Sequence, residues 1–212
     1  LGKPFDVGDP DLFADDDGRV YLYYGLSYNG GISGMEVDPK NQFRPIGEPF
    51  QCFRSNYAQH GWERRGEENL GAPTGLRFQE GPWFEGGWMT KHAGTYYLQY
   101  AAPGTEFRTY ADGVYTSKSP RGPFTYSPHS PFSHKPTGFI TGAGHSATFA
   151  DKQGRYWHIS TMRISIKHDF ERRLCIFPAE FDADGMLRVN TLFGDYPQLV
   201  PSERRNSGVD IQ

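Results

Sequence analysis

The sequence predicts an all-β protein of the β-propeller class, and its composition and an internal repeat support this prediction. Aromatic residues make up 16% of the 212 residues, beside 26 Gly and 16 Pro. Such a composition favours strands and turns over helices. Three stretches also share one layout, in which an ionisable residue precedes a Phe by four positions and a Gly with a second aromatic run follows. These stretches begin at Asp9, Glu80 and His145.

The repeat has a spacing of 71 residues from Asp9 to Glu80 and 65 residues from Glu80 to His145. Four short strands per unit with long insertions fit a propeller blade better than a helical repeat, whose units are shorter. We therefore expect three blade-like units within one domain. The expected ranges are units 9–50, 80–132 and 145–195, in a domain 1–200 that is followed by a linker or tail 201–212.

The first unit begins with a hairpin of residues 12–14 and 20–25, joined by a turn that contains three Asp and Gly18. An EF-hand calcium loop would need an oxygen ligand where Phe13 stands and a Glu well downstream, so these Asp residues predict a turn. The remaining expected strands are 31–37 and 43–50 in the first unit, 82–91, 95–100 and 113–117 with a fourth after 119–124 in the second, and 148–150, 155–160, 173–181 and 186–192 in the third.

Residues 51–79 interrupt the repeat with a charged, Gly-punctuated connection. A long connection of this kind in a compact β protein is either a mobile loop or part of a binding site, and the sequence leaves both open.

Charge and cysteine content narrow the classes of function. The net charge of −3 gives no electrostatic footprint for nucleic acid or an acidic membrane, and no apolar run approaches the length of a membrane span. Cys52 and Cys175 lack metal-ligand spacing, so we expect free thiols. The chain opens at Leu1 without a Met or a signal peptide, so we expect part of a longer polypeptide.

A propeller brings the three repeated ionisable residues together, because the innermost strand of each blade lines the central channel. Asp9, Glu80 and His145 are then expected to face one another. A Glu and an Asp in an aromatic-lined pocket suit glycoside hydrolysis, in which a carboxylic acid of raised pKa protonates the leaving oxygen. The alternative is that Asp-Pro and Glu-Gly-Pro are turns or strand caps without a catalytic role.

Several motifs resemble glycoside hydrolase family 43. Residues 9–25, from Asp-Pro-Asp-Leu-Phe to Tyr-Leu-Tyr-Tyr-Gly, resemble the motif of its second blade. Glu80-Gly81-Pro82-Trp83, followed by Tyr96-Tyr97-Leu98, resembles its general-acid blade. Gly144-His145 before Phe149 resembles its axial His, and residues 172–178 weakly resemble its downstream Arg…Pro strand.

The resemblance implies a five-bladed β-propeller that hydrolyses arabinose- or xylose-containing glycans with inversion, as arabinofuranosidases and xylosidases do. It makes Glu80 the general acid and Asp9 the carboxylate that orients Glu80 and raises its pKa. His145 would lie beneath the sugar, near a calcium ion held largely through water, and no cofactor is required. The expected substrate contacts are Phe13, Trp83, His145 and Arg172.

The chain departs from the family pattern in one respect. The family's general base is an Asp of the preceding blade, and only eight residues precede Asp9. We expect the remaining blades to come from the same longer polypeptide or from a second chain. A polysaccharide substrate implies a secreted, periplasmic or cell-surface location. A glycan-binding propeller without activity and a related propeller glycosidase or glycoside phosphorylase are the alternatives.

Overall fold

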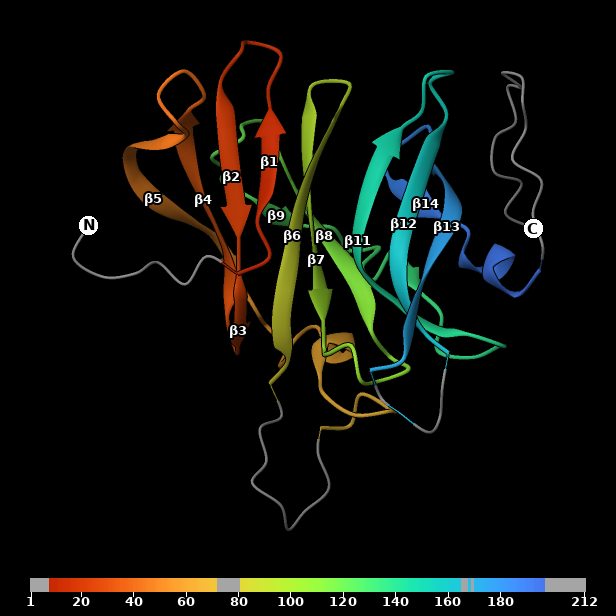
Figure 1. Ribbon diagram of the computed structural model, residues 1–212. Coiled ribbons are helices and arrows are strands. Elements are labelled where there is room, and N and C mark those ends of the chain that lie inside the picture. Colours follow the sequence, from red (N-terminus) through yellow and green to blue (C-terminus); the bar gives the residue numbers. More distant parts are fainter. Residues whose placement is uncertain (1–7, 72–80, 165–167, 169, 197–212) are drawn as a thin grey trace.

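The structure, a computed structural model, describes residues 8–71, 81–164, 168 and 170–196. Strands dominate these residues, whose helical segments are two 3₁₀ turns, η1 (Gly61–Glu63) and η2 (Thr191–Asp195). The strands form three antiparallel sheets that lie side by side in chain order (Figure 1). The all-β prediction is confirmed. Within the described residues no helix has the length and apolar character to cross a membrane.

The first sheet contains the strands of the N-terminal unit in the order β1-β2-β4-β5. Its strands are β1 (Asp11–Ala14), β2 (Val20–Tyr24), β4 (Gly31–Asp38) and β5 (Arg44–Arg54). A further strand, β3 (Leu26–Tyr28), leaves this sheet and pairs with β6 of the second sheet. The sequence did not predict β3, which joins the first two sheets at one end.

The second and third sheets repeat this plan. The second contains β6 (Trp83–His92), β7 (Thr95–Ala102) and β8 (Ala111–Ser117), with the two-residue strands β9 (Thr125–Tyr126) and β10 (Ser133–His134) both paired to β8. The third contains β11 (Thr141–Ala150), β12 (Tyr156–Arg163), β13 (Arg172–Phe181) and β14 (Leu187–Val189).

The arrangement is that of successive propeller blades. The first long strand of each unit is β1, β6 or β11, and β6 contacts both β1 and β11, so these three strands are neighbours (Figure 1). Residues at the starts of these strands therefore approach one another although they are far apart in sequence.

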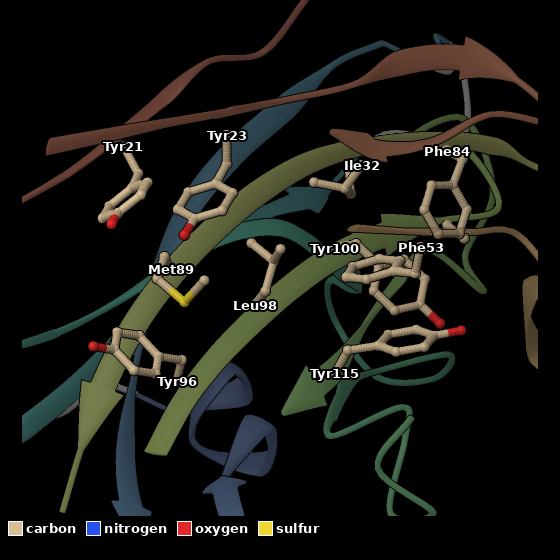
Figure 2. Close-up of a cluster of buried hydrophobic side chains, with 11 residues drawn as sticks. Tyr21, Tyr23, Ile32, Phe53, Phe84, Met89, Tyr96, Leu98, Tyr100 and Tyr115 are labelled. Carbon is tan, nitrogen blue, oxygen red and sulfur yellow. The ribbon is translucent and has the colours of Figure 1, made fainter. Parts of the chain in front are cut away.

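Aromatic side chains fill the space between the first and second sheets (Figure 2). Phe53 of β5 stacks on Tyr115 of β8 at 3.9 Å between ring centroids, and Phe84 of β6 stacks on Tyr100 of β7 at 4.4 Å. Much of the aromatic surplus thus serves the core, where such rings bury large apolar areas. Cys52 and Cys175 are half-buried free thiols.

Candidate active site

A cavity of about 610 Å³ opens where the inner ends of the three sheets meet. It is lined by acidic, basic and aromatic side chains: Asp9, Leu26, Arg65, Trp83, Glu85, Thr105, Glu106, His145, Phe170 and Arg172. Asp9 and His145 also line a second cavity of about 260 Å³, together with Trp88 and Leu174.

Three ionisable side chains meet in this cavity, one from each blade. Asp9 lies just before β1, Glu85 lies on β6 and His145 lies on β11. One oxygen or nitrogen atom from each lies within 4.8 Å of the other two. The Nδ1 atom of His145 is 3.8 Å from Oδ2 of Asp9. The predicted convergence of Asp9 and His145 is thus present in the structure, and the third member is Glu85.

The carboxyl group of Glu85 lies in an environment that favours its protonated form. The residue is 6% exposed, and burial raises its pKa above the usual range. The negative charge of Asp9 also raises this pKa, whereas a hydrogen bond donated by the hydroxyl of Tyr110 and the charge of His145 act in the opposite direction. A raised pKa keeps the carboxyl group protonated to higher pH, as a proton donor requires.

Unusual backbone conformations aim these side chains into the cavity. Asp9 and His145 have φ angles of 48° and 51°, in the left-handed region that non-glycine residues rarely adopt. Gly86 also has a positive φ, of 67°, within an irregularity of the β6–β7 ladder between Glu85 and Trp88. A Cβ atom on Gly86 would lie 2.8 Å from Cδ2 of His145. The bulge therefore brings the backbone of β6 against the imidazole ring.

Comparison with known protein families shows which family this chain belongs to. The model of glycosyl hydrolases family 43 matches residues 6–187. The chain belongs to glycosyl hydrolases family 43. This confirms the resemblance that the sequence motifs suggested.

Proteins similar in sequence include a beta-xylosidase and a xylosidase/arabinosidase. The chain is 30% identical over 134 residues to a beta-xylosidase of Xylanibacter ruminicola, covering 56% of this chain and 39% of that protein. It is 28% identical over 129 residues to a xylosidase/arabinosidase of Bacteroides ovatus, covering 56% and 38%. The chain thus spans about two fifths of the length of these relatives.

A solved structure of a thermostable family-43 glycoside hydrolase is similar with a TM-score of 0.75 and 23% identity, covering 96% of this chain and 64% of that one. This similarity supports the β-propeller fold.

The family-43 general acid was predicted at Glu80, which lies outside the described residues. Glu85 was missed, although the sequence contains a signal for it. The order Glu-Gly-x-Trp occurs twice, at Glu80–Trp83 and again at Glu85–Trp88, and the second copy runs directly into the β6–β7 hairpin. The two copies differ at the third position: the first has Pro82, and the second has Gly87, which forms with Gly86 the Gly-Gly pair at the bulge.

Two predicted substrate contacts, Trp83 and Arg172, line the cavity with Asp9 and His145. Trp83 is 37% exposed. The guanidinium of Arg172 donates to Oγ1 of Thr105 at 3.1 Å and lies 5.8 Å from the ring of Phe170. Phe13 lies elsewhere: its ring packs edge-on against Tyr96 at 6.0 Å and contributes to the core between the first two sheets.

The charged connection contributes to the cavity wall through Arg65, which pairs with Glu106 at 2.5 Å. The connection is held in place by Glu63, a fully buried residue of η1. The Glu63 carboxylate accepts hydrogen bonds from the backbone N–H of Asn56 at 2.8 Å and from the hydroxyl of Tyr100 at 2.6 Å. Of the two roles open for residues 51–79, the described part supports a place in the binding site.

The predicted calcium ion beside His145 can be compared with the donors present. Asp9, Glu85 and His145 offer two carboxylates and one imidazole nitrogen, and Oδ2 of Asp9 is buried without a hydrogen-bond partner among the described residues. Calcium takes six to eight oxygen ligands, and Glu85 already accepts the Tyr110 hydroxyl. These residues do not form a calcium site of direct ligands, and a calcium ion held through water stays a prediction.

Proposed function

We propose that this chain carries the acid-bearing blades of an inverting glycosidase that acts on xylose- or arabinose-containing glycans. The observation that carries the proposal is the convergence of Glu85, Asp9 and His145 from three blades in one cavity. Membership of family 43 and relatives named as a beta-xylosidase and a xylosidase/arabinosidase support the substrate class.

Glu85 acts as the general acid in this proposal, in place of Glu80. Its protonated carboxyl group gives a proton to the glycosidic oxygen as the bond from that oxygen to the anomeric carbon breaks. Asp9 favours the protonated form of Glu85 before each turnover, because a second negative charge beside it is unfavourable. His145 lies beneath the sugar, and Trp83 and Arg172 contact it from the cavity wall.

Inversion also requires a base that takes a proton from the attacking water as the water oxygen bonds to the anomeric carbon. Among the described residues, the carboxylates that line the cavity are Asp9, Glu85 and Glu106. Asp9 and Glu85 have other roles, and Glu106 is paired with Arg65. The described residues thus leave no cavity carboxylate for the base, and we propose that the base and the remaining blades come from the rest of a longer polypeptide or from a second chain.

The test compares Glu85→Gln with Glu80→Gln in the full natural polypeptide, using xylo- and arabino-oligosaccharides. Glu85→Gln is expected to lower kcat by about 10²–10⁴-fold, the usual contribution of a general acid, while the protein stays folded. Glu80→Gln is expected to keep kcat within a few-fold of the native value. The opposite result would make Glu80 the acid and overturn the assignment.

The wild-type protein provides the control for the reaction type. Hydrolysis without added phosphate supports the proposal. Sugar binding in calorimetry without any product would contradict it and indicate a glycan-binding propeller, and product formation that depends on phosphate would indicate a phosphorylase.

A further inference from the structure

Two buried residues contact the site residues from outside the cavity. Tyr110 lies just before β8, and Asp112 lies on it. Tyr110 is 2% exposed and Asp112 is 1% exposed. Neither lines the cavity that holds Glu85 and His145. Any effect of these residues on the reaction must therefore pass through the residues that they contact.

Tyr110 contacts the proposed acid directly. Its hydroxyl donates a hydrogen bond to Oε1 of Glu85. The ring is held in turn by Gly144 of β11, since a Cβ atom on Gly144 would lie 2.7 Å from Cδ1 of Tyr110. A buried hydroxyl in a packed ring has little freedom to move, so it restricts the orientation of the Glu85 carboxyl group.

Asp112 contacts the backbone of the axial His. Its Oδ1 atom accepts the backbone N–H of His145 at 2.9 Å, and its Oδ2 atom accepts the hydroxyl of Ser146. Buried His158 places Nε2 3.4 Å from the same Oδ2 atom, while its Nδ1 atom lies 2.8 Å from the Thr148 hydroxyl. The carboxylate is thus held on several sides within β11 and β12.

His145 needs such support because of its conformation. A φ of 51° is strained for a non-glycine residue and persists only where surrounding contacts maintain it. The hydrogen bond from His145 N–H to Asp112 is a contact of this kind, formed at the residue whose backbone is strained.

We propose that Tyr110 and Asp112 are positioning residues of the glycosidase site. Tyr110 orients the carboxyl group of Glu85 for proton donation, and Asp112 holds the backbone of His145 so that its ring stays in the cavity. This inference rests on the proposed function, because Tyr110 can orient a proton donor only if Glu85 is the general acid.

The test for Tyr110 varies the leaving group in the full natural polypeptide. Tyr110→Phe removes the hydroxyl and keeps the ring. We expect kcat/KM to fall about 10–100-fold for oligosaccharides, whose leaving oxygen needs a proton, and by less than about threefold for a dinitrophenyl glycoside, whose leaving group needs none. An equal loss on both substrates would show a general structural effect and overturn the role of Tyr110.

Tyr97→Phe is the matched control for this test. It also removes the hydroxyl of a buried tyrosine. That hydroxyl donates to the carbonyl of Gly185, between β13 and β14 of the third sheet, at 2.6 Å. This variant is expected to show the same kcat/KM ratio between the two substrates as the native protein. A leaving-group dependence equal to that of Tyr110→Phe would overturn the inference.

The test for Asp112 is a double-mutant cycle with His145. Asp112→Asn is expected to lower kcat/KM about tenfold in the native background and by less than about twofold in a His145→Ala background, because its effect passes through the axial residue. Equal losses in both backgrounds would overturn this role. If Asp112→Asn does not fold, Ser146→Ala, which removes one hydrogen bond to Asp112, replaces it in the same cycle.

Failure of the inference can be told apart from failure of the proposed function. A Glu85→Gln variant that keeps its activity would contradict the proposed function. If Glu85→Gln is inactive and Tyr110→Phe lowers kcat/KM equally on both substrates, only the positioning role is contradicted.

Discussion

At the scale of single residues, the site depends on opposing influences on one carboxyl group. Burial and the charge of Asp9 raise the pKa of Glu85, while the Tyr110 hydroxyl, the charge of His145 and the side chain of Trp83 lower it. A general acid must be protonated to act, so activity is lost as pH rises through this pKa. Each neighbour therefore has a predictable effect on the alkaline side of the pH profile.

Replacement of Asp9 by Asn tests one of these influences. Asp9→Asn removes a negative charge that raises the pKa of Glu85, so that pKa falls and the alkaline limb of kcat/KM against pH moves to lower pH. Asn also tolerates the positive φ of this position. The profile of Asp38→Asn, a change at the end of β4 in the same sheet, should match that of the native protein. An unchanged or upward-shifted limb in Asp9→Asn would contradict the electrostatic role.

At the scale of elements, irregularities in the inner strands create the site. The β6–β7 ladder shifts register between Glu85 and Trp88, and β11 shifts register between Gly142 and Gly144 and again before Ala147. Regular strands would point alternate side chains to opposite faces and leave no place for the Gly86 backbone against His145. The bulges therefore place Glu85 and His145 side by side.

Two glycine substitutions can separate the effect of backbone strain from the effect of a steric contact with His145. Gly86 and Gly94 have φ angles of 67° and 73°, but a Cβ atom meets His145 only at Gly86, whereas nothing lies within 4 Å at Gly94. Both Gly→Ala changes are expected to destabilise the protein by about 1 kcal/mol. Gly86→Ala should in addition lower kcat/KM by roughly 10–100-fold, because small displacements of a site residue are costly. Similar kcat/KM values for the two variants would contradict the proposed contact.

At the scale of the whole molecule, hydrogen bonds join the blades near the axis. Gln99 of β7 donates to the carbonyl of Ser146 at 2.6 Å and accepts the hydroxyl of Thr148 at 2.8 Å, both on β11. On the other side, Asp11 of the first blade accepts the backbone N–H of Met89 at 2.9 Å. These buried bonds link each blade to the next, so we expect the described blades to unfold as one unit.

Gln99→Leu tests this link. Gln99 is 1% exposed, and its loss leaves the Ser146 carbonyl and the Thr148 hydroxyl without the amide. We expect a loss of about 2–4 kcal/mol in the free energy of unfolding, measured by urea denaturation of the full natural polypeptide. Gln153→Leu, in a surface turn of the third sheet, should change it by less than about 0.5 kcal/mol. A comparable value for both variants would show that the blades are joined mainly by apolar packing.

Much of the site could be predicted from the sequence where a local pattern was sufficient. Asp9 and His145 stand at equivalent places in repeated units, and repetition by itself predicts their convergence. Phe13 matched the same pattern yet packs into the core, because the direction of a side chain depends on which face of the strand is covered. Arg65 had no periodic signal, since a buried carboxylate, Glu63, determines the course of its loop.

The sequence by itself determined the all-β class, the repeated blades, the family and two members of the ionisable cluster. These properties follow from composition, spacing and motifs, which are local or periodic. Only the tertiary structure decided that Glu85 lies beside Asp9 and His145, because two Glu-Gly-x-Trp copies five residues apart are nearly equivalent as sequence. The Gly86 bulge and the contact of that backbone with the His145 ring distinguish them, and such a contact between two blades exists only in the folded protein.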